Sequence, residues 1–176
     1  TLAGGDVLIG TSDDALTFNA KVDGGQDLSL ATGTGNIIFS GAVGGSTAIG
    51  DGGGAALKIA NGSTSFMNTL KTASGLDIDS AVIFYENVTV GAGDTGTSLD
   101  GNVTLDGLTF TANGALTFGN ATGDQLTLSG SDVAIGTSDD ALTFNAKVDG
   151  GQDLSLGTGT GNIIFSRAVG GSTAIG

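Results

Sequence analysis

The sequence predicts an all-β fold in which short strands wind into a parallel β-solenoid. Apolar and small polar residues alternate along most of the chain, which is typical of strands with one buried face. Phenylalanines recur at roughly the length of one solenoid coil. Proline is absent, as expected if nearly every strand N–H bonds to the coil above or below. A string of β-sandwich domains, the alternative for many short strands, would have linkers that accept proline.

The strands are predicted where the alternation is clearest. Val, Ile, Thr and Phe are enriched there, and these residues fit a pleated, half-buried surface. Turn signals rich in Gly, Asn and Asp separate the stretches every eight to twelve residues. The expected strands lie within 15–22, 27–30, 35–40, 55–60, 75–79, 81–85, 87–90, 102–110, 114–119 and 124–129. The stretch 63–74 is ambiguous.

Corners are predicted mainly at asparagines and glycines. Asn61-Gly62 and Asn113-Gly114 are the sharpest turns, because both residue types tolerate positive φ. A further corner is expected at Glu86-Asn87, since continued alternation would bury the Glu86 carboxylate without a partner. Stacked corner asparagines predict a hydrogen-bonded ladder, and a simple turn role for each asparagine is the alternative.

The eight phenylalanines each end an apolar triplet such as "LTF" or "IIF". Their successive spacings along the chain are 21, 27, 18, 26, 8, 26 and 21. If each coil contributes one ring to an interior column, coils average about 21–25 residues, within the usual range of solenoid repeats. The step of eight between Phe110 and Phe118 breaks that rhythm, so one of these two rings is expected on a different wall.

The chain contains a long internal repeat. Residues 1–50 and 127–176 are identical at 45 of 50 positions, and the differences are Ala3/Ser129, Gly5/Ser131, Leu8/Ala134, Ala31/Gly157 and Gly41/Arg167. Residues 1–126 therefore form one complete solenoid repeat unit, and 127–176 form the first part of the next near-identical unit. Neither end of the sequence reads as an end cap, so we expect further copies of the repeat as neighbours, in the same longer chain or as stacked subunits.

The composition narrows the function classes. A net charge of -13 with only five basic residues argues against binding to nucleic acid or to an anionic membrane surface. No apolar run approaches the 18 or so residues of a membrane span, so no membrane insertion is expected in this window. Cysteine is absent, so stability must come from repetition and burial.

The stretch "ALTFNAKVDGGQDLSLATGTGNIIFSGAVGGSTAIG" (15–50) resembles the repeats of giant secreted bacterial surface proteins of the filamentous-haemagglutinin type. The resemblance is good over 15–50 and 141–176, looser over 102–134 and poor over 51–101. It implies a right-handed parallel β-helix, an extracellular or cell-surface location, and a role in adhesion, biofilm or fibre formation. It implies no catalytic residues.

No catalytic, cofactor-binding or metal site is assigned from the residues. Asp77 and Asp79 are two positions apart and share one strand face, as a carboxylate pair of a carbohydrate-active β-helix enzyme would require. The chain has no histidine, however, and its only arginine replaces a glycine of the other copy. A solvated acidic strand face is the preferred interpretation, and the chain is expected not to be an enzyme.

The surface residues bear on three binding roles. Weak surface Ca²⁺ sites at Asp13, Asp14 or Asp23 stay open, although "GGQDLSL" departs from the glycine–aspartate repeat of calcium β-rolls. Ice binding needs T-x-T in register on successive coils, whereas "TGTG" occurs at 32–35 and 158–161 and is predicted to be a turn. Four sequons begin at Asn61, Asn87, Asn102 and Asn120 and are compatible with surface glycans.

Together these features predict the structural shaft of an extracellular adhesin or surface fibre, which supplies mechanical reach, cell-surface attachment or matrix formation. Host or cell-surface glycans or proteins are the expected external partners. Two alternatives stay open: a self-assembling filament subunit that stacks end to end, and a carbohydrate-active β-helix enzyme.

Overall fold

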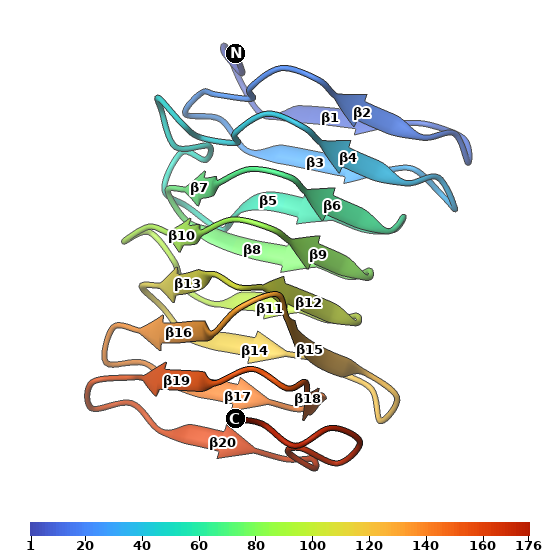
Figure 1. Ribbon diagram of the computed structural model, residues 1–176. Coiled ribbons are helices and arrows are strands. Elements are labelled where there is room, and N and C mark those ends of the chain that lie inside the picture. The colour runs from blue at the N-terminus through green and yellow to red at the C-terminus, as the bar shows by residue number, and fades with distance from the viewer.

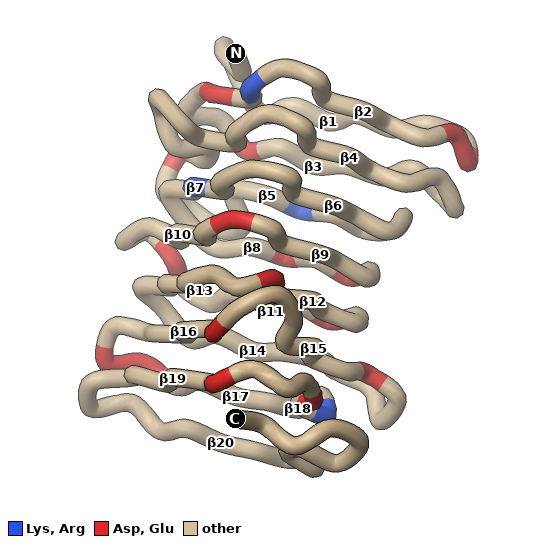
Figure 2. The backbone as a smooth tube through the Cα atoms, in the orientation of Figure 1, with Lys and Arg blue, Asp and Glu red and all other residues tan.

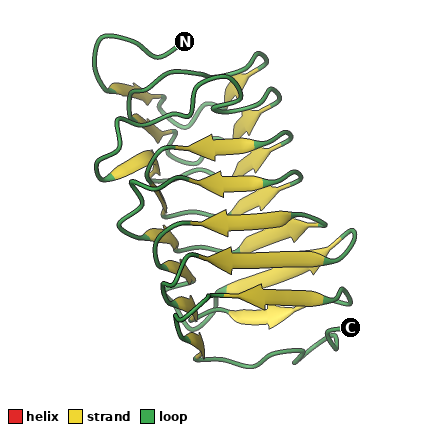
Figure 3. Ribbon diagram, turned by 90° about the vertical axis from the view of Figure 1, so that its left-hand side faces the viewer, coloured by secondary structure: helices red, strands yellow, loops and turns green.

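The computed structural model describes residues 1–176 as a single stack of parallel β-strands (Figure 1). It contains twenty strands and no helix, so no helical membrane span is present (Figure 3). Every strand pairing is parallel, and the strands fall into three sheets that form three walls. The fold is thus the right-handed parallel β-solenoid that the sequence predicts.

The chain visits the three walls in turn and completes about eight coils. The first wall holds β1 (Val7–Gly10), β3 (Leu28–Ala31), β5 (Ala55–Ile59), β8 (Gly75–Ile78), β11 (Thr97–Leu99), β14 (Leu116–Phe118), β17 (Leu142–Phe144) and β20 (Ile163–Phe165). The second holds β2 (Leu16–Phe18), β4 (Ile37–Phe39), β6 (Thr64–Phe66), β9 (Val82–Phe84), β12 (Val103–Asp106), β15 (Gln125–Ser129) and β18 (Lys147–Asp149). The third holds β7 (Leu70–Thr72), β10 (Val88–Val90), β13 (Thr109–Ala112), β16 (Val133–Thr137) and β19 (Leu154–Gly157).

Coil length varies around the predicted value. On the first wall Val7 pairs with Leu28, 21 positions later, and Leu28 pairs with Leu57, 29 positions later. The next coil is shorter, since Leu57 pairs with Leu76 after 19 positions. The long coil contains the glycine-rich segment 50–54, which precedes β5. The ambiguous stretch 63–74 forms β6 and β7. Residues 55–101 stack in the same three walls, with one register shift between Ala55 and Leu57 where β5 pairs with β8.

The core is one continuous column of side chains inside the three walls. It contains 34 buried hydrophobic residues, and strand residues alternate between this interior and the outer face. All eight phenylalanines follow one another in sequence order, one per coil, with ring centroids 4.6–6.0 Å apart. The predicted aromatic column is confirmed.

The phenylalanine column changes wall where the sequence spacing is irregular. Phe84 lies on the second wall, Phe110 on the third and Phe118 on the first. The two rings at each change of wall meet edge to face, at 87° and 69°, whereas the other rings stack within 9° of parallel. The step of eight therefore joins the third wall of one coil to the first wall of the next.

The two copies of the repeat occupy different walls. The strand at 7–10 lies on the first wall, but its copy at 133–137 lies on the third. In the same way β2 lies on the second wall and its copy β17 on the first. The boundary between the units at residues 126 and 127 falls inside β15, so the stack runs through it without interruption.

The corners follow the predicted residues, but the asparagine ladder is wrong. Asn61, Asn87 and Asn102 accept from backbone N–H groups of the neighbouring coil, and no corner asparagine bonds another asparagine. Asn61 Oδ1 accepts from the N–H groups of Thr32 and Gly33 at 2.8 and 2.9 Å, and Asn87 Oδ1 accepts from the Thr109 N–H at 2.9 Å. A ladder needs asparagines at the same position on successive coils, and here they sit at different positions. Glu86 is exposed at a corner between β9 and β10, as expected.

Candidate functional site

The predicted carboxylate pair lies on the outer face of the first wall. Asp77 points outward from β8 and Asp79 follows its end. Lys58 of the preceding coil forms an ion pair with Asp77, which raises the pKa of the lysine. Burial, and then the nearby Asp77 charge, raises the pKa of Asp79. Asp100 on the following coil accepts from the hydroxyl of Ser98 and from the Asn120 amide.

This surface is a ladder of charges across three coils. The carboxylates do share one face, as the alternation predicts, but Asp77 is already paired with a lysine. No pocket opens beside them or elsewhere on the molecule. The arrangement can pair charges between coils, and Figure 2 shows acidic residues spread along the whole stack rather than gathered at this place.

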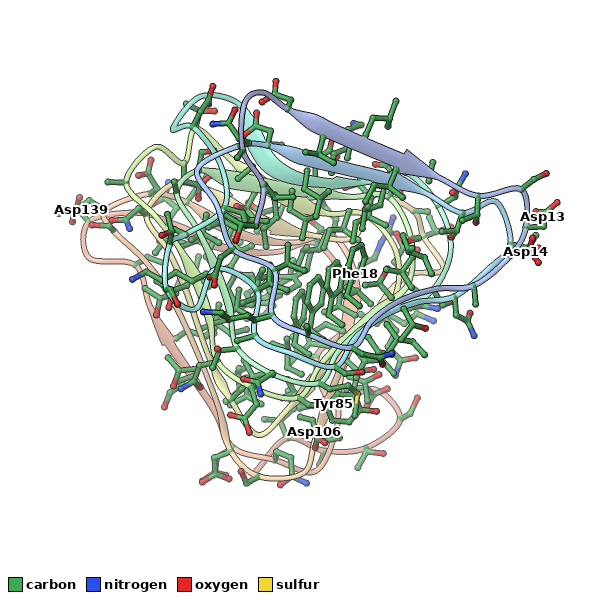
Figure 4. All side chains as sticks on the ribbon, turned by 90° about the horizontal axis from the view of Figure 1, so that it is seen from above. Asp13, Asp14, Phe18, Tyr85, Asp106 and Asp139 are labelled. Atoms are coloured by element: carbon green, nitrogen blue, oxygen red, sulfur yellow. The ribbon has the colours of Figure 1, made fainter.

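The three aspartates considered for calcium do not form one site. Asp13 lies at the corner between the first and second walls, where its Oδ1 accepts from the Thr34 N–H of the next coil at 2.8 Å. Asp14 is its exposed neighbour at the same corner (Figure 4). Asp23 lies at the corner between the third and first walls.

Asp23 is held by its own local contacts. Its Oδ1 accepts from the Ser46 N–H at 2.8 Å, and Lys21 Nζ lies 3.0 Å from its Oδ2. The hydrogen bond from Ser46 and the contact with Lys21 lower the pKa of Asp23 to about 2. Its carboxylate therefore fastens one coil to the next.

A different set of carboxylates comes together, and sequence reasoning missed it. Asp6, Asp27 and Asp51 lie on three successive coils ahead of first-wall strands, with carboxylate oxygens within 4.8 Å of one another. The Asp27 N–H donates to Asp6 Oδ1 and the Asp51 N–H to Asp27 Oδ1, both at 3.3 Å. Burial raises the pKa of Asp27. The signal was an aspartate ahead of each strand, in "DVLI", "DLSL" and "DGGGAALKI".

The threonine pairs and sequons also act as corner structure. Thr32 is buried and its hydroxyl donates to the Gly35 carbonyl at 2.6 Å, so "TGTG" is a turn. The four sequon asparagines lie at corners between strands. Three of them, Asn61, Asn87 and Asn102, accept through Oδ1 from the neighbouring coil, and Asn120 donates through Nδ2 to Asp100.

The last coil presents an apolar surface at its outer side. Phe165 is 41% exposed and Val169 46%, whereas their copies Phe39 and Val43 are fully buried. The difference has one cause: β6 and β7 cover Phe39 and Val43, and β20 has no such neighbour. Ile163 is exposed for the same reason, whereas Ile164 lies at an outward-facing strand position, as its half-buried copy Ile38 does. The same residues thus form core or surface according to whether a further coil lies on them.

Comparison of the chain with protein-family models, curated proteins and solved structures found no match.

Proposed function

We propose that this chain is the structural shaft of an extracellular adhesin or surface fibre. The observation that carries the proposal is the way the two copies of the repeat join. They stack in one uninterrupted solenoid with a continuous aromatic core, and no linker separates them. A protein built in this way changes its length by whole units while each coil keeps its neighbours.

The geometry suits a spacer. Neighbouring strands lie about 4.8 Å apart, so one 126-residue unit extends the shaft by roughly 27 Å. Coil-to-coil backbone bonds connect every wall along the axis. The strong negative charge keeps neighbouring shafts apart in solution. The resemblance of 15–50 and 141–176 to repeats of filamentous-haemagglutinin-type adhesins supports a surface location and a role in attachment or matrix formation.

The test is made in cells that carry the natural gene. Antibody against this chain should label intact cells, and deleting one 126-residue unit should shorten the surface fibre by about 27 Å and weaken attachment. The matched control exchanges one unit for its near-identical neighbour, which should change neither. Labelling only after the cells are opened would refute the proposal.

A self-assembling filament is the second candidate, favoured by the way one coil joins the next inside the stack. The parallel backbone pairing of β4 with β6, and the stacking of Phe39 on Phe66 at 4.7 Å, could join coils of separate subunits as well as coils of one chain. Negative-stain images of the purified protein at several concentrations separate the two functions. Filaments that lengthen with concentration indicate stacked subunits, and rods of constant length indicate a shaft within one chain.

A further inference from the structure

The repeat is not a whole number of coils. Each first-copy strand lies five coils and two walls before its counterpart in the second copy. β1 on the first wall corresponds to β16 on the third, β3 to β19 in the same way, and β4 on the second wall to β20 on the first. The isolated bridges agree, because Val22–Val43 lies on the third wall and its copy Val148–Val169 on the second. One unit therefore spans five and two-thirds coils.

The two copies of a corner have the same local structure although they lie at different corners of the solenoid. Asp13 has a φ of 67° and its copy Asp139 a φ of 64°. The Thr34 N–H donates to Asp13 Oδ1 at 2.8 Å, and the Thr160 N–H donates to Asp139 Oδ1 at 2.9 Å. Seen along the axis, however, Asp13 and Asp139 lie at different corners of the triangular section (Figure 4). The same local structure is thus displayed in a different direction.

The displacement has a physical basis. Each corner is fixed by bonds among its own residues and those one coil away, such as the bond between Thr34 and Asp13. The three walls share the same parallel pairing and the same alternation of buried and outward residues. A stretch of sequence therefore fits more than one wall, and the length of chain between the copies decides which wall it reaches.

We propose that successive repeat units present the same outer surface in three directions in turn, one third of a turn apart. Three units together complete a whole number of coils and return each surface to its starting side. This rests on the proposed function as a shaft and specifies how such a shaft meets its partners. Along any one side of an array, therefore, successive units present different surfaces, and a flat partner meets a given surface only once in three units. The partner that fits is one that surrounds the shaft and contacts it from all sides, as neighbouring fibres do in a meshwork.

Distances between spin labels test the rotation in the protein as it is. The chain has no cysteine, so introduced cysteines are the only labelling sites. Three double variants carry cysteines at two of the positions Thr34, Thr122 and Thr160. All three threonines are exposed. Thr34 and Thr122 share the corner between the first and second walls, and Thr160 lies between the third and first. Pulsed electron–electron double resonance measures the longer distances, and dipolar broadening of the continuous-wave spectrum measures the shortest ones.

The three label-to-label distances differ according to whether the two copies lie on different walls or on the same wall. A wall of about seven residues is roughly 23 Å wide, and coils rise about 4.8 Å. Thr34–Thr122 spans four coils on one edge, about 19 Å in either case, and is the internal control. Rotation gives about 24 Å for Thr122–Thr160 and about 35 Å for Thr34–Thr160. A repeat of six whole coils would give about 10 Å and about 29 Å.

The Thr122–Thr160 distance decides the outcome. A value of about 24 Å supports the proposal, and a value of about 10 Å overturns it. Circular dichroism of the labelled variants checks that the fold is retained, and singly labelled chains set the background. The measurement does not depend on adhesion. Failure of the rotation would leave the shaft function standing, and failure of the surface-labelling test would leave these distances unchanged.

Discussion

The repeat provides a matched experiment on the aromatic core. Phe39 and Phe165 are copies within the identical stretch "NIIFS". Phe39 is fully buried and stacks on Phe18 and Phe66, each at 4.7 Å. Phe165 is 41% exposed and stacks only on Phe144, at 4.6 Å. Replacing each with alanine tests how much the covering coil contributes.

The expected losses differ by about a factor of two to three. Phe39→Ala removes a fully buried ring and leaves a cavity between two stacked neighbours, so it should lower the free energy of unfolding by about 3–5 kcal/mol. Phe165→Ala leaves no enclosed cavity, because that side is open to solvent. Only the transfer contribution is lost, scaled to the buried six-tenths of the residue, or about 1–2 kcal/mol.

Urea unfolding followed by circular dichroism measures the global change. Hydrogen exchange read by mass spectrometry, on peptides covering 30–45 and 156–171, measures local opening, because end coils of a solenoid fray independently. Phe39→Ala should raise exchange in the coils on both sides of Phe39, and Phe165→Ala only in the last coil. Equal losses for the two variants, or a loss below about 1 kcal/mol for Phe39→Ala, would contradict the proposed core.

Three further changes test the corners. The pKa of Asp23 is lower in the folded chain than in the unfolded one. The contribution of this carboxylate to stability is therefore complete above about pH 4 and is lost as the pH falls towards about 2. Asp23→Asn should flatten acid unfolding curves over that pH range. Asn61→Ala leaves two backbone N–H groups without their acceptor and should lower the free energy of unfolding in urea by about 1–3 kcal/mol. Asn61→Asp keeps an acceptor oxygen and should lower the free energy of unfolding clearly less. Equal losses for the two variants would contradict the assigned bonds. Gly62→Ala places a Cβ 2.2 Å from Thr32 Oγ1 at a φ of 82°, whereas Gly52→Ala, at a φ of 95°, meets nothing within 4 Å. Both variants should carry backbone strain, but the first should lower the melting temperature further, and a larger shift for Gly52→Ala would count against the corner packing.

Much of the fold follows from short-range pattern. Alternation located the strands because each must place one face in the core, and the phenylalanine spacing indicated the coil length because one ring per coil fills the interior. The irregular step at Phe110 and Phe118 even indicated a change of wall. The asparagine ladder failed because a ladder requires the same position on successive coils, and coils of unequal length shift their corners.

The surface sites were harder to foresee. Asp77 and Asp79 share a face as their spacing requires, but their neighbour Lys58 comes from another coil. Asp6, Asp27 and Asp51 meet only because the intervening coils return each of them to the same corner. Such meetings depend on coil length to within a residue, which the alternation does not specify.

By itself, the sequence determined that this chain forms strands, where most of them lie, and that the segment 1–50 recurs at 127–176. These are local properties: side-chain alternation, turn residues and identity. Only the tertiary structure decided that the copy falls on a different wall, because that depends on the accumulated length of every coil between them. Each insertion or shortened corner changes the total length of chain between the two copies. The part of that length left over after whole coils decides on which wall a residue lies, and therefore in which direction it points.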